Sequence, residues 1–184
     1  MGLLRSDLAA FASDVPRCAG RTGAIKVVLI AASNPGIYAI VLYRFAAAFR
    51  RRGLAVPAAV ISLVNVFLTG ADIDQRAEIG PGFRVRHPVG VVIHGEARLG
   101  ARATLFSDVV IGQRGAGHPG VPVIGDDFLA GSGAKVLGNV TIGNRVAIGA
   151  NAVVLEDVPD DHSAVGIPAR NVRRPRPSAH KSSI

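Results

Sequence analysis

The stretch that decides the fold is Ile142-Gly-Asn-Arg-Val-Ala-Ile148-Gly-Ala-Asn-Ala-Val-Val154, in which a small or branched apolar residue returns at every sixth position. A period of six matches neither the 3.6 of an α-helix nor the two of a simple strand. Short strands that turn a corner every six residues stack into a parallel β-helix, with the apolar residue of each repeat inside the prism. Working outward, the positions on this beat are Ile124, Ala130, Val136, Ile142, Ile148 and Val154, then Ile93, Leu99, Leu105 and Ile111, and then Ile73, Ile79, Val85 and Val91.

The beat is interrupted twice. Thirteen residues separate Ile111 from Ile124, and residues 113–121 between them hold three glycines and a proline. This composition predicts a loop that projects from the prism, and such loops often carry function. A smaller slip falls between Val91 and Ile93. The expected fold is mainly β: a β-helix of about five coils, each of three six-residue repeats.

The chain divides into three parts. We expect an α-helical N-terminal region over residues 1–70, the β-helix domain over 71–167 and a basic C-terminal tail over 168–184. Within the first part, Asn34-Pro35 is a typical helix start, and Gly53 is a typical end.

A second apolar stretch, residues 54–68, carries no charge and approaches the ~20 residues that a membrane span needs. We favour a short helix buried in an oligomer, because Pro57 and Asn65 suit a span poorly. Peripheral membrane attachment through Arg50–Arg52 is the alternative that stays open.

The composition of the chain limits the kinds of partner that we expect it to bind. Hydrophobic residues make up 49% and charged residues 18%, which predicts oligomerisation. The net charge of +8 could attract nucleic acid, anionic lipid or a phosphorylated cofactor. Nucleic acid is not expected, because aromatics are 5%, tryptophan is absent and no recognition motif occurs. The single cysteine, Cys18, and the lack of a signal-peptide core near the N-terminus favour the cytoplasm.

Among five histidines, His87 is the strongest candidate for a general base, because it lies inside the prism region. Asp72 precedes it by slightly less than one coil, which places the two on consecutive rungs, and a carboxylate can orient an imidazole that acts as a base. His118, in the projecting loop, is a candidate substrate contact, whereas His94 is assigned a corner position. No metal is expected, since no histidine pair has close ligand spacing.

The segments Leu129-Ala-Gly-Ser-Gly-Ala-Lys-Val-Leu-Gly-Asn-Val-Thr-Ile-Gly143 and Val165-Gly-Ile-Pro-Ala-Arg170, together with the Asp72/His87 spacing, resemble the serine acetyltransferases. The likeness covers about residues 34–173. Residues 111–116 also resemble bacterial acetyltransferases of the colanic-acid type, which decorate exopolysaccharide.

The resemblance implies a left-handed β-helix, a homotrimer or dimer of trimers, and acetyl-CoA held between neighbouring prisms. It gives His87 the role of catalytic base and Asp72 that of its partner. Backbone amides at Gly112 and Gln113 would stabilise the oxyanion. The remaining coenzyme contacts that it implies are Gly131, Ser132 and Ala150 along the pantetheine, and Lys135 and Arg170 at the phosphates.

The sequence also departs from the family. Arg86 stands where the family has an aspartate, which inverts the local charge and weakens attraction for a substrate ammonium. The family's Arg-His pair at the end of the loop is replaced here by Gly117-His118 or by Gly120-Val121. The terminal Ile184 is similar to the isoleucine with which the family binds a cysteine synthase partner.

The expected activity is an acetyl-CoA-dependent O-acetyltransferase that converts L-serine to O-acetyl-L-serine in cysteine biosynthesis. One alternative keeps the chemistry but makes the acceptor a sugar hydroxyl in exopolysaccharide biosynthesis, which Arg86 and the basic surface favour. The other is a non-catalytic trimeric scaffold.

Overall fold

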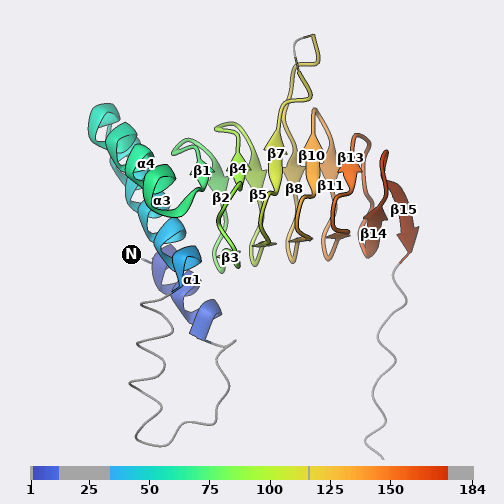
Figure 1. The fold of residues 1–184 in the computed structure, drawn as a ribbon, viewed down its shortest axis with the longest axis horizontal. Coiled ribbons are helices and arrows are strands. Elements are labelled where there is room, and N and C mark those ends of the chain that lie inside the picture. Colours follow the sequence, from blue (N-terminus) through green and yellow to red (C-terminus); the bar gives the residue numbers. More distant parts are fainter. Residues whose placement is uncertain (1, 13–33, 116, 174–184) are drawn as a thin grey trace, which may run out of the picture.

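Helices cover one end of a prism of stacked coils (Figure 1). A computed structural model describes residues 2–12, 34–115 and 117–173. The expectations for Cys18, for Ile184 and for the tail beyond residue 173 lie outside the described residues. The helices are α1 (Gly2–Ala12), α3 (Pro35–Arg51) and α4 (Ala55–Thr69).

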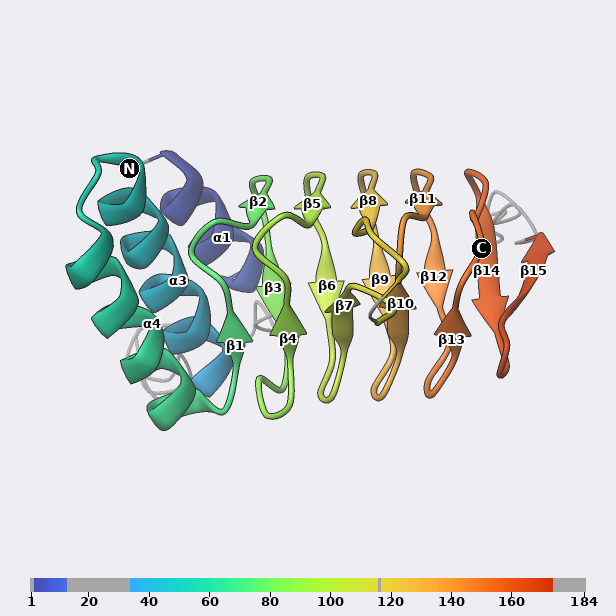
Figure 2. The ribbon, with the colours of Figure 1, turned by 90° about the horizontal axis from the view of Figure 1, so that it is seen from above.

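Three sheets form the sides of the prism, and successive strands step from one side to the next (Figure 2). Sheet A contains β1 (Asp72–Ile73), β4 (Val92–Ile93), β7 (Val110–Gly112), β10 (Lys135–Leu137) and β13 (Val153–Val154). Sheet B contains β2 (Glu78–Ile79), β5 (Arg98–Leu99), β8 (Val123–Ile124) and β11 (Thr141–Ile142). Sheet C contains β3 (Arg84–Val85), β6 (Thr104–Leu105), β9 (Leu129–Ala130), β12 (Ala147–Ile148), β14 (His162–Val165) and β15 (Arg170–Arg173).

The six-residue beat is confirmed as the inner lining of the prism. All 14 of its positions are buried, and the strand pairs within the coils are parallel. A regular coil consists of three repeats, as in the path from Val92 to its neighbour Val110. The fold is therefore a parallel β-helix.

Both interruptions of the beat lie at corners. Asp72 pairs with Val92, so the first coil is longer than a regular one by two residues, which widen the corner between β3 and β4. Val110 pairs with Lys135, so a later coil is longer still. Its extra residues form the expected loop, which projects from the prism between β7 and β8 (Figure 1).

Each set of corners forms an edge along the prism. We call residues 86–91, 106–109, 131–134 and 149–152 the C–A edge, because they lead from sheet C into sheet A. The A–B edge contains residues 74–77, 94–97, 113–122, 138–140 and 155–157. The B–C edge contains residues 80–83, 100–103, 125–128 and 143–146 and ends at Asp160 and Asp161.

The B–C edge carries a ladder of charges. Arg102, Asp127, Arg145 and Asp161 occupy equivalent left-handed positions with φ between 57° and 61°. Arg102 bonds Asp127 at 2.6 Å, and Arg145 bonds Asp161 at 2.6 Å. The alternation of sign places each arginine opposite an acid of the next coil.

The helix α3 begins as the sequence predicts. The Asn34 side chain accepts a hydrogen bond from the amide of Gly36 at 3.0 Å, and Pro35 follows in the first turn. Arg50 and Arg51 lie in its last turn, where cations suit the helix dipole.

A buried ion pair fastens the helices to the first coil. Arg44 of α3 donates to Asp7 of α1 at 2.8 Å and to the carbonyls of Ile79 and Gly80 at 2.6 Å. Asp7 also accepts from the amide of Phe83 at 2.9 Å. The pair satisfies its polar atoms with backbone groups of the prism, so α1, α3 and the B–C edge are held together.

In contrast to α3, α4 is largely exposed in the single chain. Its buried residues, Ala58, Asn65 and Thr69, face α3, and the Asn65 amide donates to the carbonyl of Ala39 at 3.0 Å. Within the described ranges, no helix combines the length and the apolar character needed to cross a membrane.

The far end differs from the expectation of a tail beginning at residue 168. β15 pairs antiparallel with β14, from His162 opposite Arg173 to Val165 opposite Arg170. The basic composition of residues 170–173 concealed a strand, because its side chains are exposed and carry no apolar beat.

Candidate active site

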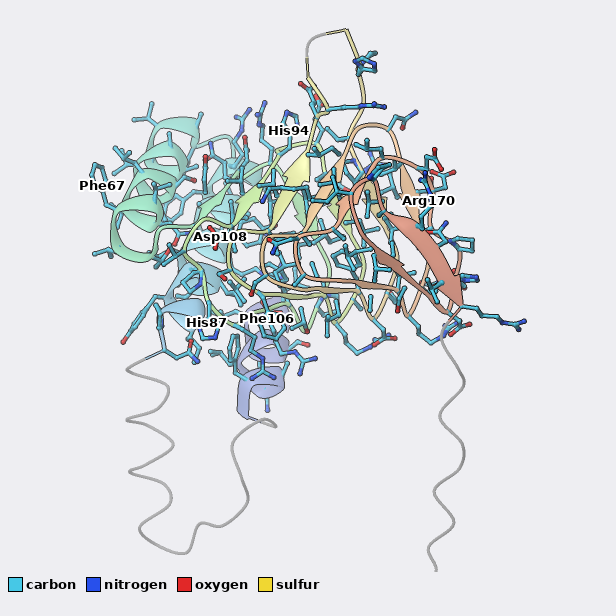
Figure 3. All side chains as sticks on the ribbon, turned by 45° about the vertical axis from the view of Figure 1, so that its right-hand side comes forward. Phe67, His87, His94, Phe106, Asp108 and Arg170 are labelled. Carbon is cyan, nitrogen blue, oxygen red and sulfur yellow. The ribbon has the colours of Figure 1, made fainter. Side chains whose placement is uncertain are left out.

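His87 lies in the widened corner between β3 and β4, on the C–A edge, and its side chain is exposed. Its ring packs against that of Phe106, with centroids 6.4 Å apart and planes at 48° (Figure 3). Phe106 occupies the next coil of the same edge and was missed from sequence. The pairing of Arg84 with Thr104 brings residues 86–87 beside residue 106, and this adjacency depends on the lengthened coil, not on a local sequence pattern.

Asp72 is the first residue of β1, and its exposed side chain points outward from sheet A. Its amide donates to the carbonyl of Val91 at 2.8 Å, so it lies just past the corner that contains His87. Among the described residues, the Asp72 carboxylate makes no hydrogen bond to the His87 imidazole. The pairing of these two groups stays a prediction.

Asp72 also lines a hollow of about 370 Å³ over β1, β4 and β7, together with Asp74, His94, Gly112 and Gln113. Sequence reasoning missed Asp74 and His94 as site candidates, because a first coil of regular length would not align them. The two extra residues of this coil bring them onto adjacent rungs, where the Asp74 amide bonds the carbonyl of Ile93 at 3.1 Å.

Hydrogen bonds fix the charge of Asp74 and the tautomer of His94 in this hollow. Hydrogen bonds from the Arg76 guanidinium lower the pKa of the Asp74 carboxyl below its usual value, so Asp74 is ionised at neutral pH. The Nδ1 atom of His94 accepts a hydrogen bond from the amide of Glu96 at 3.2 Å. That contact leaves Nε2 as the nitrogen that carries the proton of the neutral ring.

The projecting loop begins directly after this hollow. Gly112, at the end of β7, is buried, whereas Gln113 is exposed. His118 is exposed farther along the loop, and its amide donates to the carbonyl of Gly115 at 3.2 Å. Arg86, by contrast, is half-buried on the C–A edge beside His87, and its amide donates to the carbonyl of Leu105 at 2.8 Å.

Small residues line the C–A edge beyond His87. Ser132 and Ala150 are exposed, and a Cβ at Gly131 would lie 2.8 Å from the amide nitrogen of Ala150. An extended ligand could therefore lie along this edge without meeting a large side chain. Lys135, which begins β10, donates to the carbonyls of Asp108 and Gly133 at 2.8 and 3.1 Å.

A second hollow, of about 360 Å³, lies at the far end of sheet A. Its lining includes Arg114 from the loop, Arg170 from β15 and Glu156. Arg170 was a sequence candidate, whereas Arg114 was not. Two guanidinium groups in one hollow provide a site that fits phosphate oxygens.

The candidate residues therefore fall into two groups within one chain. His87, Arg86, Gly131, Ser132 and Ala150 lie on the C–A edge, where strands enter sheet A. Gly112 ends β7, and Gln113 and His118 follow it on the A–B edge, where strands leave sheet A. Figure 3 shows His87 of the C–A edge and His94 of the A–B edge well apart. Among the described residues, no three histidine, cysteine or acidic side chains gather closely enough to hold a metal.

Residues 122–156 match the family model described as bacterial transferase hexapeptide (six repeats). The prism and its corner sites thus define a hexapeptide-repeat transferase. The chain is 43% identical to a serine acetyltransferase of Bacillus pumilus over 152 residues, which cover 80% of this chain and 67% of that protein. The chain belongs to the serine acetyltransferase family, a family of acyltransferases, as the motifs indicated.

Solved structures of serine acetyltransferases have the same fold as this chain. A serine acetyltransferase of Neisseria gonorrhoeae in complex with serine has a TM-score of 0.81 at 29% identity, covering 92% of this chain and 67% of that one. A serine acetyltransferase in complex with CoA has a TM-score of 0.79 at 26% identity, with coverages of 92% and 68%. The chain spans about two thirds of the length of these proteins.

Proposed function

We propose that this protein transfers the acetyl group of acetyl-CoA to the hydroxyl of L-serine, which yields O-acetyl-L-serine and CoA, the first of which feeds cysteine biosynthesis. The observation that carries the proposal is membership of the serine acetyltransferase family over four fifths of the chain. The exposed imidazole in a widened corner of the prism supports it.

In this mechanism, His87 removes the proton of the serine hydroxyl, and the oxygen attacks the thioester carbonyl. Backbone amides at Gly112 and Gln113 stabilise the negative oxygen of the tetrahedral intermediate. The C–S bond then breaks, and the CoA thiolate leaves with the proton that His87 had taken. Asp72 orients the imidazole and stabilises its charged form.

A second copy of the chain completes the site in this proposal. His87 lies where strands enter sheet A, and Gly112 lies where they leave it, so one prism holds the base and the oxyanion donors at opposite edges. Neighbouring prisms in a homotrimer bring the entry edge of one against the exit edge of the next. The left-handed sense of the coils is part of the same proposal, as is pairing of trimers.

Acetyl-CoA fits the residues that are present. We assign the phosphates to the hollow of Arg114 and Arg170 and the pantetheine to the C–A edge at Gly131, Ser132 and Ala150. Lys135 adds positive charge beside that edge, although two carbonyls already accept from its ammonium.

The hollow over β1, β4 and β7 suits the amino group of serine. Asp72 and Asp74 line it, and the low pKa of Asp74 keeps that carboxyl charged. Because Arg76 already pairs with Asp74 at 2.7 Å, we assign to Asp72 the negative charge that Arg86 removes from the neighbouring corner. His118 of the loop is assigned to the substrate.

The division into a helical N-terminal region and a β-helix domain, a cytoplasmic location and a cysteine synthase partner at Ile184 belong to the same proposal. The single cysteine supports a reducing compartment.

The test offers purified protein acetyl-CoA with L-serine, then with sugar acceptors, and follows thiol release. We expect turnover with serine and a loss of about 10²–10⁴-fold in His87→Ala, as removal of a general base typically gives. His162→Ala, which changes a histidine at the start of β14 outside the proposed site, is the control. Turnover with sugars alone would contradict the serine assignment, and no CoA binding by calorimetry would indicate the scaffold.

A further inference from the structure

The helical cap, residues 2–12 and 34–70, exposes an apolar face that the acetyl-transfer site does not use. Phe67 of α4 is 81% exposed and projects from the end of the molecule (Figure 3). No charged residue occurs between Gly53 and Ala71. The exposed apolar side chains of α4 and the residue before it are Leu54, Val56, Val60, Leu63, Val64, Val66, Phe67 and Leu68.

The exposed charge of the described part of the cap is positive. Residues 1–70 contain eight basic and two acidic residues, which gives +6 of the net +8. Within the described part of the cap, the acid is Asp7, which is buried against Arg44. The exposed cations there are Arg5 and the run Arg50, Arg51 and Arg52.

The position of the arginine run links it to the apolar face. Arg50 and Arg51 end α3, Arg52 caps it, and α4 begins at Ala55. The arginine run therefore lies at the start of α4, and Arg50 and Arg51 also line a hollow beside the prism together with Gln75 and Glu78. An exposed apolar helix with a basic cluster at its end is the combination that binds an anionic bilayer surface, where apolar side chains enter the headgroup region and arginines meet phosphates.

We propose that the outer face of α4, with Arg50, Arg51 and Arg52, docks on an anionic lipid membrane. The sign of the charge favours this occupant over a second cap placed face to face against this one. Two caps placed face to face would bring their arginines together, and the described cap offers no exposed acid to pair with them. An anionic leaflet supplies that countercharge and solvates the apolar face at once.

The proposal is tested by co-sedimentation of the full chain with vesicles of phosphatidylcholine mixed with phosphatidylserine, and with vesicles of phosphatidylcholine alone. We expect the protein to sediment with the anionic vesicles and to release from them in high salt. Arg50→Gln/Arg51→Gln/Arg52→Gln should weaken partitioning by about 100-fold, since each arginine contributes about one kilocalorie of attraction. Phe67→Ser/Leu68→Ser should weaken it by at least about tenfold.

Matched controls change the same residue types elsewhere. Val172→Ser alters an exposed apolar residue at the opposite end, and Arg102→Gln/Arg145→Gln removes cations from the B–C edge. Both should bind vesicles like the wild type. Wild-type protein that stays in the supernatant with anionic vesicles overturns the proposal.

Sedimentation velocity of the same variants tests the alternative that a second copy of the chain covers this face. A fall in oligomer mass in Phe67→Ser/Leu68→Ser, with vesicle binding unchanged, would assign the face to a second copy and overturn the membrane proposal. Equal vesicle binding by the wild type and the arginine variant would also overturn the membrane proposal. So would equal binding of the wild type to both vesicle types. Acetyl transfer is measured in parallel, because its loss bears on the proposed function and not on the cap.

Discussion

Tyr43 is a buried phenol beneath the helices, with 1% of its surface exposed. Its hydroxyl donates to the carbonyl of Ala77 at 2.7 Å, which ties α3 to the A–B edge of the first coil. The Arg44 guanidinium lies 5.3 Å from the centre of its ring. Burial raises the pKa of Tyr43 from 10.0 to about 12, and the nearby charge of Arg44 opposes that rise without cancelling it.

This pKa predicts an alkaline loss of stability. The folded pKa lies above the unfolded one, so the stabilisation is complete below about pH 10 and is lost as pH rises toward 12. Two pKa units correspond to roughly 2–3 kcal/mol of unfolding free energy.

Titration of the tyrosinate absorbance measures the pKa of Tyr43, with the Tyr43→Phe protein as the reference. The signal can be assigned because the chain has one other tyrosine and no tryptophan. In the Tyr43→Phe protein, the alkaline loss of stability should shrink. A Tyr43 phenol that titrates at 10.0 in the folded protein would contradict the assignment.

At the scale of elements, the first turn of α3 makes a close approach to the prism. A Cβ at Gly36 would collide with the carbonyl oxygen of Val85 in β3, and that oxygen belongs to backbone and has little freedom to move. The position therefore requires glycine for packing and not for an unusual φ. Helix α3 can seat on β3 only because residue 36 has no side chain.

Gly36→Ala should displace α3 from β3 and lower the melting temperature. A loss of about 2–4 kcal/mol is expected, in the range of overpacked or broken core contacts. Gly2→Ala is the control, since a Cβ there meets nothing within 4 Å. Thermal unfolding of both variants tests this prediction. A Gly36→Ala protein with the melting temperature of the wild type would show that α3 does not pack on β3 here.

Sequence predicted the elements where apolar side chains mark them. The inner residue of each strand from β1 to β13 followed the beat, and Asn34-Pro35 marked the start of α3. The extra residues of the first coil were located less well, because corner residues face solvent and obey no hydrophobic period. β15 was missed for the same reason, since pairing with β14 and not burial makes it a strand.

At the scale of the whole molecule, the B–C edge forms a continuous ladder of charge across several coils. A hydrogen bond from Arg102 lowers the pKa of the Asp127 carboxyl, and hydrogen bonds from Asn144 lower that of Asp160. Both folded pKa values lie below the usual 3.8. Their contribution to stability is therefore present above about pH 4 and disappears as pH falls through the folded values.

Asp127→Asn should lower the melting temperature by about 2 °C near neutral pH, since exposed ion pairs contribute little each. The difference from the wild type should vanish in acid, once the carboxylate is protonated. Asp108→Asn is the matched control, because Asp108 has a similar positive φ but no ion pair among the described residues. Melting curves across the acid range check this, and a difference that persists in acid would contradict it.

The candidate site was predictable only in part. His87 was selected because it lies inside the prism region, and the loop was predicted because it breaks the repeat. Asp74 and His94 were not, since their adjacency depends on the lengthened first coil. The hollow that joins Arg114 to Arg170 brings together residues that are far apart in the sequence and follows from no local pattern.

The antiparallel closing strand has a consequence for polymerisation. Stacked parallel strands offer a template on which another chain can add, the geometry by which fibrils grow. Here the last strand of sheet C reverses direction and presents Arg170 and Arg173, while helices close the other end. An incoming chain would meet like charge and the wrong polarity, which keeps this solenoid a finite particle and not the seed of a filament.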